Sequence, residues 1–141
     1  MNEQDNVALI QKVYAAFAAG DIQTILDHLT PDVEWVLEGP AIIPFAGRKV
    51  GPKQVLTFFE ALATTQQDQK LTIAEYVAQG DTVATIGRYS ALVTATGKRM
   101  DSATAHVFTI RNGKIARFLD YPDTADMAQA YVTSATAASG Q

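Results

Sequence analysis

Three ionisable side chains in the C-terminal half of this 141-residue chain have the types and spacing for acid/base chemistry: Arg88, His106 and Asp120. They lie in segments where polar and apolar residues alternate, so one face of a sheet can hold all three. A carboxylate that burial destabilises and an arginine stabilises can be tuned as a general base. An imidazole, with an unperturbed pKa of about 6.5, can give or take a proton. We therefore predict that Asp120 is the base, His106 the acid or oxyanion donor, and Arg88 the group that fixes Asp120.

The composition excludes several other kinds of chemistry. With no Cys and only two His, the chain cannot build thiolate zinc sites, iron–sulfur clusters, cysteine nucleophiles or three-histidine metal sites, so we expect no metal and no cofactor. The net charge is -4 and the 11 basic residues are scattered, which argues against a nucleic-acid partner. The N-terminus is polar and acidic, and no apolar run approaches ~20 residues. We expect no membrane segment and a cytoplasmic location.

The order of the predicted elements indicates an α+β fold. Apolar residues recur at helical spacing over 7–19 and 22–29, a short strand covers 33–37, and Gly51-Pro52 begins a third helix. Four strands follow, at about 71–78, 82–94, 98–110 and 114–121, and a short helix extends to Tyr131. We predict a cone-shaped, curved, mainly antiparallel sheet around a pocket that three helices from the N-terminal half cover. Residues 1–131 would form one domain, with a flexible tail at 132–141.

The registers of two hairpins decide whether the three catalytic candidates meet. Three-residue loops at 111–113 and 95–97 would pair His106 with Phe118 and Arg88 with Thr104. Even-numbered residues then share the inner face, with Arg88, Thr104 and Asp120 in one row and His106 a diagonal step from Asp120. A two-residue turn at either hairpin would put His106 and Asp120 on opposite faces.

Other side chains are predicted to line the pocket. Trp35 forms its wall or mouth, and its indole N–H needs an acceptor, either Asp120 or a ligand. The alternatives to a catalytic role are that Asp120 and Arg88 form a purely structural ion pair and that His106 is a core histidine. The remaining predicted substrate-binding residues lie on the first strand, the helices or the inner sheet face: Leu37, Tyr14, Phe17, Phe58, Ser90, Thr104, Phe108 and Phe118.

The outer face of the predicted sheet is too apolar to be left in water. Its predicted members come from three strands: Tyr89, Ala91, Val93, Ala103, Ala105, Val107, Leu119 and Tyr121. We therefore expect a homodimer through this convex face.

Short motifs in a fixed order resemble the nuclear transport factor 2-like superfamily, in its SnoaL-like and ketosteroid-isomerase-like branch. The resemblance covers about 7–131 and rests on five stretches: Ala19-Gly20-Asp21, 30–35, 46–52 with Gly51-Pro52, 108–115 with Asn112-Gly113, and 120–123. Compared with ketosteroid isomerase, His106 stands where that family has its protonated aspartic acid. Compared with limonene epoxide hydrolase, Arg88 and Asp120 stand where that family has its arginine and one aspartate, and Ser90 replaces the second.

The resemblance implies a cone-shaped fold and a small largely apolar molecule as ligand. Enzymes with this fold include isomerases, dehydratases, cyclases and epoxide hydrolases, and other members only bind. We therefore expect cofactor-free acid/base chemistry on a small carbonyl, hydroxyl or epoxide compound. The alternative is a non-catalytic binding protein for a small hydrophobic ligand.

Overall fold

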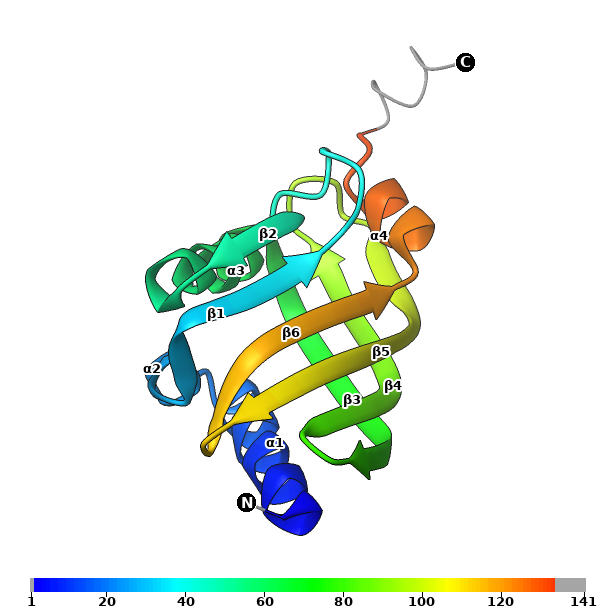
Figure 1. Cartoon of the computed structure of the whole chain (residues 1–141). Coiled ribbons are helices and arrows are strands. Elements are labelled where there is room, and N and C mark those ends of the chain that lie inside the picture. Colours follow the sequence, from blue (N-terminus) through cyan, green and yellow to red (C-terminus); the bar gives the residue numbers. More distant parts are fainter. Residues whose placement is uncertain (1, 134–141) are drawn as a thin grey trace.

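The fold is seen in a computed structural model that describes residues 2–133 (Figure 1). Six strands form one curved sheet in the order β2-β1-β6-β5-β4-β3, and helices cover its inner face. All neighbouring strands are antiparallel except β1 and β6, which are parallel. The predicted α+β class with a curved, unclosed sheet is confirmed. Most of the predicted tail, 134–141, lies outside the described residues.

Three helices in the N-terminal half begin where local chemistry favours them. Asn2 caps α1 (Glu3–Ala18) by accepting a hydrogen bond from the Asp5 backbone N–H at 2.8 Å, and Asp21 caps α2 (Ile22–Asp27) in the same way. Gly20, between them, has a φ of 71°, which glycine adopts without strain. Pro52 opens α3 (Pro52–Thr65), where its missing N–H costs nothing.

Four long strands follow α3, as predicted, but the sheet is larger than predicted. Its strands are β1 (Leu29–Leu37), β2 (Gly47–Val50), β3 (Gln66–Gln79), β4 (Thr82–Val93), β5 (Arg99–Arg111) and β6 (Lys114–Pro122). The strand that the sequence did not predict is β2, which pairs with β1 and forms one edge of the sheet. The short α4 (Thr124–Ala130) closes one end of the cone.

The hairpin between β5 and β6 has a two-residue turn, and a bulge compensates for it. Asn112 and Gly113 both have positive φ angles, 53° and 76°, as this tight turn requires. The register then shifts between Thr109 and Ile110, where Ala116 is the extra residue on β6. As a result His106 lies directly opposite Asp120, not opposite Phe118 as predicted. The predicted pairing was wrong by two residues, but both side chains lie on the inner face.

The register predicted between β4 and β5 was also wrong, and here nothing compensates. The Val93 N–H donates to the Lys98 carbonyl, so four residues, 94–97, form the loop of this hairpin, and Arg88 pairs with Ala103 instead of Thr104. This shift of one residue reverses the faces of β4, because successive side chains alternate. Tyr89, Ala91 and Val93 therefore lie on the inner face, where the prediction had put Arg88.

The core lies between the inner face of the sheet and the helices. Helix α1 contacts β3 and β4, and α3 contacts β1 and β2. The periodic apolar residues of both helices are buried there, including Ile10, Val13, Val55 and Phe58. None of the helices within 2–133 is long and apolar enough to span a membrane.

Candidate active site

A cavity opens between the sheet and the helices, and aromatic rings line most of it. The space between its lining atoms, with the open solvent at its mouth included, is about 620 Å³. The six phenylalanines of the wall come from α1, α3, β5, β6 and the loop before β2: Phe17, Phe45, Phe58, Phe59, Phe108 and Phe118. Aliphatic side chains fill the gaps: Val13, Ile25, Leu62, Leu71, Pro122 and Met127.

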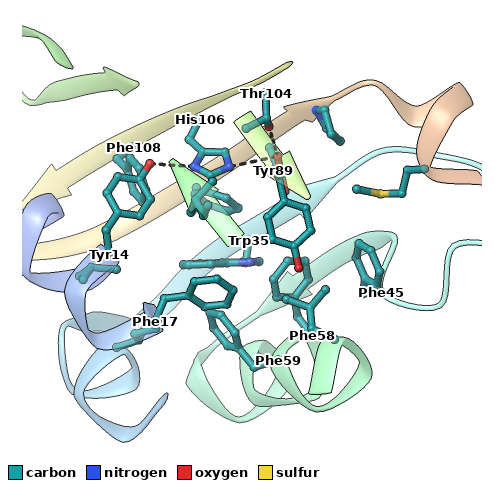
Figure 2. A pocket seen from close by; sticks show the side chains of 18 residues that line it. Tyr14, Phe17, Trp35, Phe45, Phe58, Phe59, Tyr89, Thr104, His106 and Phe108 are labelled. Carbon is teal, nitrogen blue, oxygen red and sulfur yellow. Dashed lines mark hydrogen bonds and ion pairs between the residues drawn. The ribbon is translucent and has the colours of Figure 1, made fainter. Parts of the chain in front are cut away.

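A chain of three polar side chains crosses one wall of this cavity. The Tyr14 hydroxyl, from α1, is 2.7 Å from Nδ1 of His106 on β5 (Figure 2). On the other side of the imidazole, Nε2 is 3.4 Å from Oδ1 of Asp120 on β6. The side chains of His106 and Asp120 are only 8% and 12% exposed, so water screens their interaction little.

The hydrogen-bond partners give this chain a direction. Tyr14 also lies 2.6 Å from the Thr85 hydroxyl on β4, which is buried. Each contact joins one donor and one acceptor when Thr85 donates to Tyr14, Tyr14 donates to Nδ1 of His106, and Nε2–H of His106 faces Asp120. Thr104 donates to the same Oδ1 of Asp120 at 3.3 Å. These contacts leave Oδ2 of Asp120 without a partner among the described residues.

The environment of Tyr14 keeps its phenol protonated. Burial raises the pKa of this group above its ordinary value of 10.0, and the hydrogen bond with Thr85 offsets only part of that effect. Tyr14 therefore remains a hydrogen-bond donor to His106 at neutral pH and well above it.

Trp35 forms the floor of the cavity and carries a polar atom without a protein partner. It is 3% exposed, stacks on Phe118 with ring centroids 4.0 Å apart, and contacts Phe58 and Phe59 edge-on or tilted. Its indole Nε1 is buried, and within residues 2–133 no acceptor lies in hydrogen-bond reach. A buried donor left in this state costs about 1–3 kcal/mol.

Tyr89 closes the cavity on the side of β4, which the sequence prediction missed. Its hydroxyl donates to Oε1 of the buried Gln66 at 2.5 Å, and Gln66 in turn donates to the Tyr131 hydroxyl at 3.0 Å. Burial raises the pKa of the Tyr89 phenol, so it too stays neutral. The missed signal was the length of the 94–97 connection, which determines the face of every β4 residue.

Three predicted site residues lie away from the cavity. Arg88 is on the outer face, where its Nε is 2.6 Å from Oδ1 of Asp101, so it does not fix Asp120. Ser90 is on the same outer face and accepts a hydrogen bond from Arg99. Leu37 points inward beside Asp120 but is 1% exposed within the core and does not line the cavity. The first two errors have one cause, the one-residue shift between β4 and β5.

The other predicted residues lie together around the cavity. His106 and Asp120 face each other across adjacent strands, and Thr104 lies two residues before His106 on the same face of β5. The helices and strands bring the rest to the same space: Tyr14, Phe17, Trp35, Phe58, Phe108 and Phe118. In the part of the chain that the structure describes, no group of three or more His, Cys, Asp or Glu is placed to hold a metal ion.

Known proteins share both this sequence pattern and this fold. A model of the SnoaL-like domain matches residues 10–118. Protein Rv0034 of Mycobacterium tuberculosis, itself uncharacterized, is 25% identical over 121 residues, which are 86% of this chain and 91% of that protein.

Two solved structures are similar over nearly the full described length. An NTF2-like protein of unknown function from Burkholderia pseudomallei has a TM-score of 0.85 and 25% identity, and the match covers 94% of this chain and 100% of the Burkholderia chain. TerC, co-crystallized with polyporic acid, has a TM-score of 0.81 and 30% identity, and the match covers 90% of this chain and 98% of the TerC chain. The chain therefore belongs to the SnoaL-like domain family, within the NTF2-like fold.

Proposed function

We propose that this protein is an enzyme that uses cofactor-free acid/base chemistry on a small, largely apolar carbonyl, hydroxyl or epoxide compound. The observation that carries the proposal is the buried Tyr14–His106–Asp120 chain in the wall of an otherwise apolar cavity. Ionisable groups held in contact within a cleft are candidates for a functional site. The crystallisation of the relative TerC with polyporic acid agrees with a small organic ligand.

In this proposal Asp120 is the base. Its Oδ2 takes a proton from a carbon next to a carbonyl group, or from a hydroxyl or water that is to attack. The oxygen that becomes negative is stabilised by Nε2–H of His106, which faces Oδ1 of Asp120 before the reaction and turns to the substrate oxygen as the carboxylate takes the proton. Tyr14 is a positioning residue, because its hydrogen bond to Nδ1 holds His106 in the Nε2–H tautomer.

The test is base-catalysed exchange of hydrogen for deuterium next to a carbonyl group, followed by NMR with 2-tetralone, a neutral bicyclic ketone. We expect the protein to accelerate exchange above the buffer rate. Asp120→Asn should lower that acceleration about 100-fold or more, the usual contribution of a general base, and should still bind the ketone. Asp101→Asn is the matched control, because Asp101 is an exposed carboxylate on the outer face; it should leave exchange unchanged.

Two outcomes would contradict the enzyme hypothesis in different ways. Equal exchange in wild type and Asp120→Asn would remove Asp120 as the base. Binding of 2-tetralone and related ketones with no exchange above buffer would favour the alternative, a non-catalytic protein that binds small hydrophobic ligands.

We also propose that the protein is a homodimer through the outer face of the sheet. Apolar side chains that point away from the cavity support this: Ala84, Ile86, Ala105, Val107, Leu119 and Tyr121. Ile86 and Tyr121 are 46% and 58% exposed in the single chain, and a patch of this kind is unfavourable in water. The cytoplasmic location stays a prediction.

A further inference from the structure

The unpartnered indole of Trp35 is a second polar feature of the cavity, separate from the Tyr14–His106–Asp120 chain. Every ring it contacts, from Phe58, Phe59 and Phe118, lacks a hydrogen-bond acceptor. In Figure 2 the indole is seen nearly edge-on, with its nitrogen on the side toward Tyr89. The Tyr89 hydroxyl donates to Gln66, and none of the described residues accepts a hydrogen bond from the buried Nε1–H.

The sheet places this donor at a defined distance from the base. Trp35 pairs with Phe118 across the parallel strands β1 and β6, and Leu37 pairs with Asp120 two residues further on. Trp35 and Asp120 are therefore one diagonal step apart on the same face, roughly 8 Å between backbones from ordinary strand spacing and rise. One aromatic molecule can reach both.

The charges around the cavity restrict the kind of acceptor. Asp120 is the only Asp or Glu among the lining residues, and no Lys or Arg lines the cavity. A carboxylate on the ligand would meet the charge of Asp120 and find no permanent cation to pair with. A neutral oxygen, as in a ketone, has no such cost and accepts a hydrogen bond from an indole N–H.

We propose that Trp35 is a specificity-determining residue whose indole N–H donates a hydrogen bond to a neutral carbonyl-type oxygen of a bound aromatic ligand. This inference rests on the proposed function, because it assumes that the cavity is the ligand site. It adds a substrate class, neutral aromatic carbonyl compounds, and a second polar contact opposite the base.

The test uses benzophenone and diphenylmethane, which differ by a carbonyl oxygen in place of two hydrogens. Benzophenone has no hydrogen next to its carbonyl, so binding is measured apart from catalysis. Trp35 is the only Trp of the chain, so one indole N–H signal is expected in a ¹⁵N-correlated NMR spectrum. Benzophenone should shift that proton downfield, as a new hydrogen bond does, and diphenylmethane should not.

Affinity measurements on Trp35→Phe complete the test. This variant keeps an aromatic ring but removes the donor, so it should bind benzophenone about 3- to 10-fold more weakly, the net effect of one hydrogen bond. Its affinity for diphenylmethane should change less than about 2-fold on the same basis. Phe58→Leu is the control, because it removes only apolar contact and should weaken both probes by a similar factor.

Three results would overturn the inference. Equal losses for both probes in Trp35→Phe, or an indole signal that benzophenone moves no more than diphenylmethane does, would show that Nε1–H is not a ligand donor, while the cavity remained the binding site. The NMR result applies to the wild-type chain and holds even if Trp35→Phe fails to fold. If neither probe binds, the cavity is not a site for neutral aromatic compounds, and the inference fails together with the proposed ligand class.

Discussion

Tyr14 shows how one side chain connects the first helix with the chemistry of the sheet. It reaches from α1 across the cavity wall to Thr85 on β4 and His106 on β5, at 2.6 and 2.7 Å. The sequence predicted Tyr14 as a substrate-binding residue of the pocket, with no contact to His106. Its role as a donor to His106 depends on which faces β4 and β5 present, and no local pattern in α1 contains that information.

The raised pKa of Tyr14 predicts how stability depends on alkaline pH. The folded state holds the phenolic proton more tightly than the unfolded chain, whose phenol ionises near 10.0. The stabilising contribution is therefore complete below pH 10 and is lost as the pH rises toward the folded pKa. Above pH 10, wild type should lose up to about 1.4 kcal/mol more per pH unit than Tyr14→Phe.

Urea unfolding of both proteins at several pH values between 8 and 11.5 measures this difference. The two proteins should have nearly parallel stability curves below pH 9, and the curves should diverge in slope above pH 10. Parallel curves throughout would mean that the Tyr14 phenol ionises equally in the folded and unfolded states.

At the scale of the elements, turn chemistry and strand register determined which predictions succeeded. Asn112-Gly113 correctly marked the turn before β6, and alternation correctly grouped His106 with Phe108. The bulge at Ala116 has no sequence signature, because Ala is neither a turn former nor a bulge marker. It nevertheless decides that Asp120 faces His106, since the two-residue turn alone would have turned Asp120 outward.

The β4 to β5 connection shows why the arginine was misplaced. Thr96-Gly97 marks a turn there, but a three-residue loop, 95–97, and a four-residue loop, 94–97, both contain this pair. The φ of 71° at Gly97 is compatible with both lengths, because a three-residue loop also ends on a left-handed residue. The predicted loop was one residue too short, and this placed Arg88 at the cavity where the structure has Tyr89. Composition and spacing could not reveal this error.

Gly87 allows a close approach between β3 and β4, and this gives a prediction about the sheet. A Cβ atom added there would lie 2.1 Å from the Thr72 carbonyl oxygen and 3.0 Å from the Ile73 Cα, both rigid backbone. Gly87→Ala should therefore force the strands apart at the irregularity next to Ile73 and lower the free energy of unfolding by about 3 kcal/mol.

Gly97→Ala is the matched control for this prediction. Gly97 has a positive φ but open space around it, so its substitution should cost only about 1 kcal/mol of backbone strain. Urea denaturation of both variants gives the comparison. A loss for Gly87→Ala no larger than that for Gly97→Ala would show that the two strands separate easily at this point.

At the scale of the whole molecule, the fold could be predicted from the order of its elements, whereas the residues that line the cavity could not. Helix, helix, strand, helix and a run of strands predict one curved sheet with helices on its inner face. Which aromatic rings face the cavity depends on contacts between distant segments, such as Phe45 near Tyr131 and Phe17 near Phe59. These contacts form only once the sheet has curved around the helices.

The outer sheet face carries the prediction about assembly. Ile86 pairs with Ala105 and is 46% exposed on this face, so Ile86→Lys should place a charge in the dimer interface and convert the dimer to a monomer. Val50→Lys is the control, because Val50 is similarly exposed but lies on the edge strand β2. Sedimentation velocity at micromolar concentration distinguishes the species. A monomeric wild type would contradict the proposed dimer.

The central claim is that Asp120 and His106 act as one catalytic unit, and a double-variant comparison of 2-tetralone exchange tests it most directly. Asp120→Asn and His106→Phe should each reduce exchange, by about 100-fold or more for the base. If the two side chains work together, the double variant should be no slower than the slower single variant, because the first substitution already disables the unit. Losses that multiply in the double variant, or no loss in either single variant, would contradict the claim.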